Sequence, residues 1–363
     1  MSKKFIIAGG GTGGHIFPAV AIANAIKQQL NDAVFLFVGA NGKMEMEKVP
    51  QAGYAIEGID IAGFNRSNWF KNVGLPFKLL KSFFQVAQIF KKFKPDAVVG
   101  VGGYSTFPVL KFAQSKGIST FIHEANSFAG KSNMLLAKKA TKVFTATEGM
   151  EKFFPVEKIF ISGNPVRSAI VNSSIDKQTA LNHFGLKSNV KTLLVIGGSL
   201  GAKSINEAVK ENLDLLEKNN IQLIWQTGIP FYDTAKKATE NNSMVKVNDF
   251  IQRMDCAYAA ADVVVSRSGA MSVSELSIVR KPVIFVPYPH AAEDHQTANA
   301  MKLVQQNAAL MVNDNEAKEK LIPALIALMN NEAEQERMKN NIVKFAIPDA
   351  DKRVAKEIIK IIS

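Results

Sequence analysis

Short apolar runs alternate with longer helical patterns along the whole chain. The runs are rich in β-branched residues, and their hydrophobic positions follow one another without alternating with polar ones. Such continuous apolar runs are typical of strands that are covered on both faces in a parallel sheet. The strands predicted on this basis lie at residues 5–8, 34–38, 96–100, 120–123, 142–146, 192–196, 222–226, 245–250, 262–266 and 282–286.

This alternation of strand and helix predicts doubly wound α/β units, and the pattern starts twice. The stretches "FIIAGGGTGGH" (5–15) and "LLVIGGSLGAK" (193–203) each run a buried strand into a glycine turn and a helix. A length of 363 residues also fits two domains. Between them, the polar stretch 163–178 is the candidate linker. The tail predicts an amphipathic helix with Asp349 or Asp351 as its N-cap.

The composition indicates a folded protein and its expected cellular location. Hydrophobic residues make up 47% and charged residues 21%, which allows a sizeable core and argues against disorder. The single cysteine, Cys256, cannot form a disulfide within the chain. No apolar run is long enough for a membrane span, and the first one is too short and glycine-rich for a signal peptide. We therefore expect a soluble or peripheral, cytoplasmic protein.

The charge balance points to an anionic partner. Lysine and arginine total 44 against 32 acidic residues, giving a formal net charge of +12. A surplus of this size favours nucleic acid, an anionic membrane surface or a phosphate-bearing substrate. Charge alone does not choose among the three.

The first glycine turn contains Gly9-x-Gly11-x-x-Gly14, followed directly by His15. A strand, glycine turn and helix in this order bring backbone N–H groups to a diphosphate. An NAD or FAD site also needs an acidic residue about 20 residues further on, but residues 39–41 read GAN. The pattern therefore favours a sugar-phosphate or pyrophosphate ligand. An NAD or FAD oxidoreductase and a turn without a ligand remain alternatives.

Polar clusters follow three other predicted strands. They are "HEAN" (123–126), "SRSGAMSVSE" (266–275) and the region of "HQTANA" (295–300). In α/β folds, ligands bind beyond the carboxyl ends of the strands. "HEAN" together with His15 therefore predicts a polar cleft wall, and the small residues before Glu275 suit contact with an anion. Glu275 itself fits either a helix cap or a ligand of ribose hydroxyls.

Two further patterns are interpreted as coincidental. The stretch "ANSFAGKS" (125–132) matches a loose phosphate-loop pattern, but no apolar strand ends in the acidic residue that would hold magnesium. The histidines and acids at 290–295 do not have the spacing of a zinc motif. We expect neither a metal nor a cofactor.

Residues 64–96 interleave aromatic and basic side chains. An amphipathic basic helix with aromatic residues suits insertion into an anionic interface. A core helix with solvated lysines is the main alternative, and single-stranded nucleic acid lacks a supporting motif. The residues predicted to contact the membrane are Trp69, Phe70, Lys71, Lys78 and Lys81.

Taken together, the motifs resemble those of the MurG-type glycosyltransferases, from Phe5 into the terminal helix. Those enzymes attach N-acetylglucosamine to the lipid-linked muramyl-peptide precursor of bacterial peptidoglycan. The segments that carry the resemblance, in order, are "GGGTGGHIFPA", "VGGYSTFP", "HEAN", "GNPVR", "GGSLGA", "RSGAMSVSE" and "HQTANA".

The resemblance implies the GT-B architecture, an α/β fold of two doubly wound Rossmann-like domains that face a cleft. Residues 1–164 would form the acceptor- and membrane-facing domain, with the helix at 345–363 packing back on it. Residues 165–344 would form the UDP-sugar-binding domain. A GT-B glycosyltransferase with another nucleotide sugar or acceptor is the alternative.

The resemblance also implies a site for UDP-N-acetylglucosamine and one for the acceptor. The implied donor contacts are Thr12, Gly13, Gly14, Asn126, Arg167, Ser199, Ile251, Ala270, Met271, Ser272, Val273, Ser274, Glu275, Gln296 and Asn299. The acceptor side would use the first glycine loop, Tyr104, Glu124 and Asn133. The chain departs from the family pattern at Ala125, Leu200 and Met134, which affects details of donor and acceptor contact.

The chemistry of sugar transfer needs a base for the acceptor hydroxyl and stabilisation of the leaving diphosphate. Helix N-termini and Arg167 suit the second task, because their fields favour negative charge. His15 is the candidate base, since a neutral imidazole accepts a proton near pH 7. Glu124 is either a rival base or the group that orients the acceptor.

The expected reaction inverts the anomeric carbon and forms a β-1,4 linkage to the C4 hydroxyl of the lipid-linked sugar. The implied partners are UDP-N-acetylglucosamine, undecaprenyl-pyrophosphoryl-MurNAc-pentapeptide and the anionic inner leaflet, but not nucleic acid. The expected location is the cytoplasmic face of the bacterial cell membrane.

Overall fold

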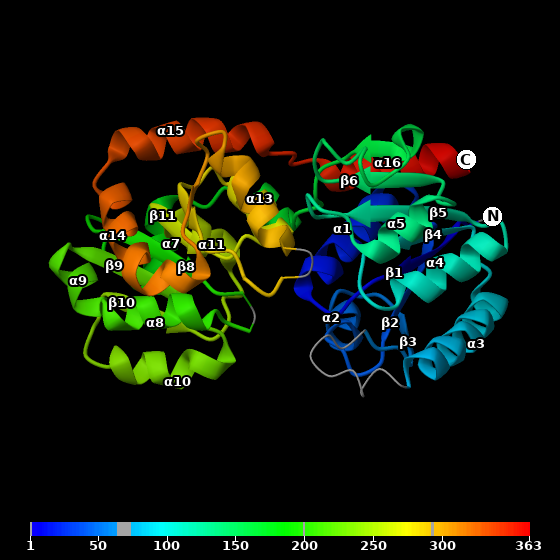
Figure 1. Ribbon diagram of the computed structural model, residues 1–363, viewed down its shortest axis with the longest axis horizontal. Coiled ribbons are helices and arrows are strands. Elements are labelled where there is room, and N and C mark those ends of the chain that lie inside the picture. The colour runs from blue at the N-terminus through cyan, green and yellow to red at the C-terminus, as the bar shows by residue number, and fades with distance from the viewer. Residues whose placement is uncertain (1, 64–73, 199, 292–293) are drawn as a thin grey trace. The chain divides into compact units, whose positions relative to one another are not determined.

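The structure is a computed structural model that describes residues 2–63, 74–198, 200–291 and 294–363. Its chain divides into two compact units (Figure 1). The first unit consists of Met1–Arg167 and Ile347–Ser363, and the second of Ser168–Ala346. The chain therefore leaves the first unit after Arg167 and returns to it for its last helix.

The first unit is built on a parallel sheet. Among the described residues its strand order is β3-β2-β1-β4-β5-β6-β7. The strands are β1 (Lys4–Ala8), β2 (Val34–Ala40), β3 (Ile56–Ile59), β4 (Ala97–Gly100), β5 (Ser119–Glu124), β6 (Lys142–Thr145) and β7 (Ile159–Ile161). The helices are α1 (Gly13–Gln29), α2 (Glu45–Gln51), α3 (Leu75–Phe93), α4 (Thr106–Ser115), α5 (Lys131–Ala137) and α16 (Ala350–Ile362).

Helices cover both faces of this sheet, which explains its continuous apolar strands. On β1, Phe5 and Ile7 face a core that includes side chains of α1 and α16. Ile6, on the opposite face, belongs to a second core with side chains of α3, α4 and α5. In Figure 1, α16 (red) lies with the blue and cyan elements of this unit. Residues 5–8 of the strand are therefore all buried, as the sequence predicts.

The second unit repeats the arrangement with a parallel sheet in the order β10-β9-β8-β11-β12-β13. The strands are β8 (Lys191–Ile196), β9 (Ile221–Gln226), β10 (Val245–Asn248), β11 (Val263–Ser266), β12 (Val283–Phe285) and β13 (Leu310–Met311). The helices are α6 (Ser168–Val171), α7 (Lys177–Phe184), α8 (Lys203–Glu211), α9 (Leu213–Lys218), α10 (Ile229–Ala238), α11 (Met254–Ala260), α12 (Ala270–Ile278), α13 (His295–Val304), α14 (Ala317–Met329) and α15 (Glu332–Ile342).

Each sheet has a topological switch point between its first strand and a strand from later in the chain. β1 pairs with β4 in the first unit, and β8 pairs with β11 in the second. At such a point the connections leave in opposite directions, which opens a crevice at the carboxyl ends of the strands. The glycines of the first turn, at 9–14, and Gly197 and Gly198 of the second lie at these ends.

The fold class and the ten predicted strands are confirmed, while β3, β7 and β13 were not predicted. These three lie at or near sheet edges, and β3 and β7 are only partly buried, so neither has the run of buried apolar residues that marks a central strand. The predicted linker at 163–178 contains the boundary between the two units, after Arg167, but it also contains α6 and the first two residues of α7.

The terminal helix has its predicted start but not its predicted cap. Asp349 occupies the N-cap position, yet its side chain makes no capping hydrogen bond. Asp351 lies inside the helix, where its Oδ1 accepts from the N–H of Lys352 at 2.8 Å. The helix is held by packing, with Val354 and Ile358 fully buried. No helix within the described ranges is long and apolar enough to cross a bilayer.

Candidate active site

The backbone N–H groups of the first glycine turn form hydrogen bonds with other residues of the first unit. Three successive N–H groups of the turn donate to other parts of the first unit. Gly9 donates to the Val38 carbonyl at 3.3 Å, Gly10 to the Gly102 carbonyl at 3.2 Å, and Gly11 to Oε2 of Glu45 at 2.7 Å. No N–H at these three positions is left for a dinucleotide phosphate. The geometry therefore argues against the NAD or FAD alternative.

A second glycine turn, after β4, packs directly on the first. A Cβ at position 103 would lie 2.4 Å from the Gly10 carbonyl oxygen. A Cβ at position 102 would lie 2.7 Å from Nε2 of His15, and Gly102 has a φ of +98°, which disfavours any side chain. The "VGGY" motif is thus needed to leave room for the imidazole.

His15 stands half-buried in the first turn of α1. Its Nδ1–H donates to the Gly10 carbonyl oxygen at 2.9 Å. A carbonyl can only accept a hydrogen bond, so in the neutral ring the proton sits on Nδ1 and the lone pair on Nε2. This tautomer presents Nε2 as a proton acceptor, as a general base requires.

Glu124, at the end of β5, is 4% exposed and fully hydrogen-bonded. Its Oε1 accepts from the backbone N–H of Asn126 at 3.1 Å and from the Asn126 side-chain amide at 3.3 Å. Its Oε2 accepts from the Gly130 N–H at 3.1 Å and the Asn133 amide at 2.9 Å. The carboxylate is therefore the hub of the loop at 125–133, in the sense that it accepts hydrogen bonds from three residues along it. The Gly130 N–H serves this hub, in keeping with a coincidental phosphate-loop match.

His123 does not line a cleft wall as the sequence predicts, because it is only 1% exposed. Its Nε2–H donates to the Gly163 carbonyl at 3.2 Å. Burial, with a smaller contribution from the nearby charge of His15, lowers the pKa of His123 to about 4. The imidazole is therefore neutral at pH 7 and fills the core.

Arg167 and Tyr104 lie at the surface of the first unit. The guanidinium of Arg167 lies 5.0 Å above the ring centre of Phe17 in α1, and that ring is adjacent to Gly13. Arg167 is thus held beside the N-terminal turn that begins after Thr12. Tyr104 is 48% exposed and covers Gly63, where a Cβ would lie 2.0 Å from its ring.

In the second unit, most of the predicted donor residues lie in the first turns of α12 and α13. Ser268 links the two helices, because its Oγ donates to the Gln296 carbonyl at 2.8 Å and its carbonyl accepts from the Asn299 amide at 3.1 Å. Oε1 of Gln296 accepts from the Tyr288 N–H at 2.9 Å. Residues 270–275 form the first turns of α12, whose leading N–H groups favour an anion. Ser199 lies outside the described residues.

Glu275 and Ile251 are both buried and both held by partners that the sequence analysis missed. Oε2 of Glu275 accepts from the hydroxyl of Tyr258 at 2.9 Å. The N–H of Ile251 donates to Oε1 of Gln226 at 2.9 Å, and the Gln226 amide donates to the Gly198 carbonyl at 3.2 Å. Gln226 thus ties the second glycine turn to the Ile251 loop. In the sequence, Gln226 stands out only as a polar residue at the end of an apolar strand.

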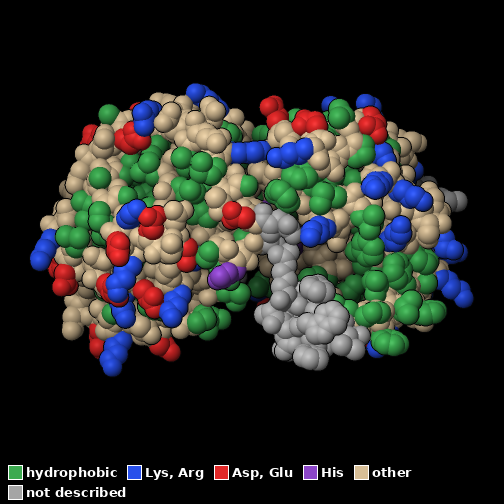
Figure 2. Space-filling view, viewed as in Figure 1, with side chains coloured by type: hydrophobic (Ala, Val, Ile, Leu, Met, Phe, Trp, Pro, Cys, Tyr) green, Lys and Arg blue, Asp and Glu red, His purple; other side chains and the backbone are tan. Residues whose placement is uncertain are grey.

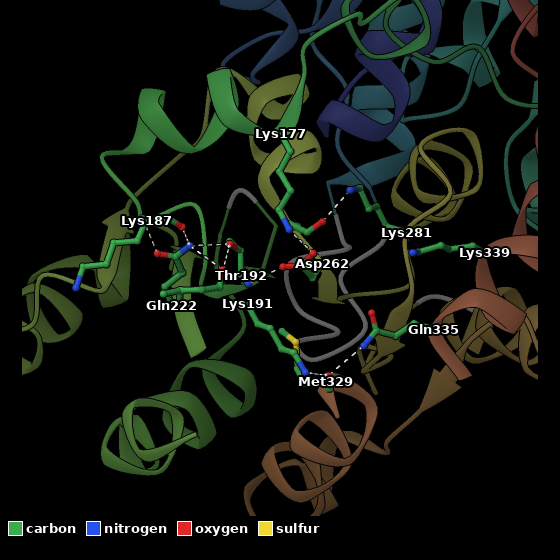
Figure 3. A network of polar contacts seen from close by, with 12 residues as sticks. Lys177, Lys187, Lys191, Thr192, Gln222, Asp262, Lys281, Met329, Gln335 and Lys339 are labelled. Carbon is green, nitrogen blue, oxygen red and sulfur yellow. Dashed lines mark hydrogen bonds and ion pairs between the residues drawn. The ribbon is translucent and has the colours of Figure 1, made fainter. Parts of the chain in front are cut away.

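A second polar network lies at the opposite, amino-terminal edge of the same sheet (Figure 3). Nζ of Lys177 lies 2.5 Å from Oδ1 of Asp262, whose Oδ2 accepts from the Thr192 N–H at 2.8 Å. Lys281 donates to the Ala261 carbonyl at 2.7 Å, and burial lowers its pKa to about 8. Lysines 177 and 191 also line an open cavity of about 550 Å³ here. Their bonds tie strands to helices, so we interpret the network as structural.

The first half of α3 exposes three large apolar side chains among lysines. Phe77, Leu80 and Phe84 are 75%, 60% and 73% exposed, and their spacing places them on one side of the helix. Figure 2 shows hydrophobic side chains gathered over this helix at the lower right, with Lys and Arg side chains nearby. Nζ of Lys81 lies 2.7 Å from Asp60. A role in the core alone would explain the buried side of α3, but it would not explain the exposed side chains of Phe77, Leu80 and Phe84.

Three of the predicted membrane residues, Trp69, Phe70 and Lys71, lie outside the described residues. Lys78 and Lys81 are on α3. Across the described ranges, no group of three or more His, Cys, Asp and Glu side chains could hold a metal ion.

The chain matches the models of one protein family over most of its length. The N-terminal domain model of glycosyltransferase family 28 matches residues 5–145, and the C-terminal domain model matches residues 192–354. A UDP-N-acetylglucosamine–N-acetylmuramyl-(pentapeptide) pyrophosphoryl-undecaprenol N-acetylglucosamine transferase from Phocaeicola vulgatus is 49% identical over 99% of this chain and 96% of its own length. The transferase of the same name from Cytophaga hutchinsonii is also 49% identical, over 99% of this chain and 97% of its own.

Solved structures agree with this similarity. The crystal structure of MurG from Acinetobacter baumannii superposes with a TM-score of 0.77 at 30% identity, covering 99% of both chains. A UDP-GlcNAc 2-epimerase from Neisseria meningitidis, solved bound to UDP-GlcNAc, has a TM-score of 0.69 at 15% identity, over 99% of this chain and 100% of its own. The second likeness concerns the fold alone.

Proposed function

The chain belongs to the UDP-N-acetylglucosamine–N-acetylmuramyl-(pentapeptide) pyrophosphoryl-undecaprenol N-acetylglucosamine transferases of glycosyltransferase family 28, and we propose that it transfers N-acetylglucosamine from UDP to the C4 hydroxyl of the lipid-linked acceptor. The observation that carries the mechanism is the bond from His15 Nδ1–H to the Gly10 carbonyl. It leaves Nε2 as the proton acceptor of a half-buried imidazole.

In this reaction the acceptor oxygen attacks the anomeric carbon while Nε2 of His15 takes its proton. The bond from the anomeric carbon to the diphosphate breaks, and UDP leaves with the electron pair. Attack from the face opposite the leaving group inverts the anomeric carbon. The first N–H groups of α12, with Arg167, stabilise the charge that develops on the diphosphate.

Glu124 is better suited to organise the acceptor side than to act as the base. Both of its oxygens already accept two hydrogen bonds each. A carboxylate so committed has little capacity left for a substrate proton. It fixes Asn126 for the donor and the loop that carries Asn133 for the acceptor.

Most of the proposed donor contacts lie in the second unit. Residues 270–275 hold the diphosphate and ribose, with Glu275 positioned by Tyr258. Ile251 contacts the uracil from a loop that Gln226 holds in place. Gln296 and Asn299 read the sugar from the start of α13, and Ser199 comes from the second glycine turn. Thr12, Gly13 and Gly14 reach the donor from the first unit, and Tyr104 contacts the acceptor.

The reaction is tested with labelled UDP-N-acetylglucosamine and undecaprenyl-pyrophosphoryl-MurNAc-pentapeptide. We expect transfer of the label to the lipid with release of one UDP per sugar, and the same rate with EDTA present. Faster transfer from another UDP-sugar, or UDP release only with a different acceptor, would assign the chain another specificity.

The proposed location is the cytoplasmic face of the cell membrane, with α3 as the contact. Phe77, Leu80 and Phe84 insert into the interface, and Lys78 and Lys81 face anionic headgroups. Burying a large apolar side chain is worth about 1.5–3 kcal/mol, and a lysine near such a surface about 1 kcal/mol. These terms together suffice for reversible binding.

Replacing Phe77, Leu80 and Phe84 by serine is therefore expected to lower binding to phosphatidylglycerol-containing vesicles at least tenfold. Cosedimentation measures it, with transfer to a water-soluble acceptor analogue as a check that the site is intact. Ile229→Ser is the matched control, because Ile229 is 75% exposed in the second unit. Equal binding of the triple variant and the control would exclude α3 as the membrane contact.

A further inference from the structure

A buried carboxylate stands behind the first glycine turn. Glu45, the first residue of α2, is only 1% exposed. Its Oε1 accepts from the Ala40 N–H at 3.0 Å and its Oε2 from the Gly11 N–H at 2.7 Å. Glu45 therefore joins the ends of β1 and β2, where a dinucleotide-binding fold holds its ligand.

The glycines around Glu45 make room for this carboxylate. A Cβ at position 10 would lie 2.1 Å from the Cδ atom of Glu45, and a Cβ at position 39 would lie 2.5 Å from its Cγ. Neither position could carry a side chain while Glu45 is in place. Part of the glycine pattern thus serves a side chain of the protein itself.

The carboxylate and the imidazole meet on one peptide group. The Gly11 N–H that binds Glu45 and the Gly10 carbonyl that binds His15 belong to the same peptide unit. In a planar trans peptide these two groups point in opposite directions, so Glu45 holds one side and His15 the other. Rotation of this peptide would break both bonds together.

We propose that Glu45 is a positioning residue for His15, acting through the Gly10–Gly11 peptide. By binding the N–H, the carboxylate fixes the direction of the carbonyl and polarises it as an acceptor. A firmly held carbonyl keeps the proton of the neutral ring on Nδ1 and the lone pair on Nε2. In other enzymes a carboxylate that contacts the histidine directly gives the same control.

The inference rests on the proposed role of His15 as base, but its first test does not need turnover. Nitrogen-15 NMR at pH 8.5 distinguishes the two imidazole tautomers, and the chain has only 5 histidines to assign. The full-length protein is expected to show His15 with its proton on Nδ1. A His15 signal with the proton on Nε2 would overturn the inference, whatever the activity of the enzyme.

Glu45→Gln is the informative variant, because it keeps the size of the side chain but replaces one acceptor by a donor. One of the two N–H groups then faces an NH₂ group. We expect the His15 signal to become a mixture of tautomers and kcat to fall about 10- to 100-fold, the scale of a small misplacement of a catalytic group. KM for UDP-N-acetylglucosamine is expected to change less than kcat, because most of the proposed donor contacts lie in the second unit.

Glu47→Gln is the matched control, since it removes the same charge from the exposed side of the same helix. It should keep both the tautomer and kcat. Glu45→Asp keeps the charge but is too short to reach both N–H groups, and it should lie between the wild type and Glu45→Gln. If Glu45→Gln is folded by circular dichroism and retains both the wild-type kcat and the Nδ1–H signal, Glu45 has no positioning role.

If His15→Gln retains turnover while Glu45→Gln still shifts the His15 tautomer, the base assignment fails and the positioning contact stands.

Discussion

His15→Gln is expected to lower kcat by about 10²- to 10⁴-fold, the usual contribution of a positioned general base. Glutamine can still donate to the Gly10 carbonyl, so the turn should keep its shape. Its amide cannot take the proton of the acceptor hydroxyl. KM for both substrates should change by less than about threefold, because the lost interaction belongs to the transition state. Steady-state release of UDP at varied donor and acceptor concentrations measures both constants.

His183→Gln is the control for this experiment. His183 is exposed on α7 of the second unit, and its replacement should leave kcat unchanged. If His15→Ala and Glu124→Ala both retained near-full turnover at saturating substrates, neither residue could be the base. The proposed mechanism would then be wrong even though the family assignment stands.

Glu124→Ala is expected to lower the free energy of unfolding by about 2–5 kcal/mol, because it removes the acceptor of four hydrogen bonds, one of them buried and three partly buried. The donors that lose this acceptor are the backbone N–H groups of Asn126 and Gly130 and the side-chain amides of Asn126 and Asn133. Urea unfolding followed by circular dichroism measures the loss. Glu157→Ala, at an exposed position of the same unit, should change stability by less than about 0.5 kcal/mol.

The two proposed roles of Glu124 give different results with glutamine. If Glu124 only holds the 125–133 loop, the Glu124→Gln variant should lose stability and activity together, because the new NH₂ group faces hydrogen-bond donors. If Glu124 is the base, the variant should lose activity with its stability unchanged. The second outcome would transfer the base assignment from His15 to Glu124.

The central strands could be predicted because each depends on a local property of the sequence. Phe5, Ile6 and Ile7 are all buried, and no polar position interrupts them. The edge strand β3 reads "IEGI", with Glu57 exposed and Gly58 in the middle, so its pairing with β2 has no such signal. Strands of this kind are defined by their neighbours and appear only in the folded sheet.

Some site residues likewise have a local signal in the sequence, and others depend on the folded structure. The glycine turns and His15 stand next to a predicted strand, where ligand-binding groups are expected. Glu45 was not predicted, because the dinucleotide-binding pattern places its acidic residue at the end of the second strand. The acid that reaches the turn comes five residues after Ala40, from the start of α2. The four bonds of Glu124 depend on the path of the following loop, which no spacing rule describes.

The position of α16 has a consequence for biosynthesis. This helix supplies Val354, Ala355 and Ile358 to the core that also contains Phe5 and Ile22. It is made after the whole of the second unit, Ser168–Ala346, has been translated. The amino-terminal sheet therefore lacks one of the helices that cover its Phe5 face until the last residues are synthesised, after the whole inserted unit. In this chain, the part translated first needs the residues translated last to complete its core.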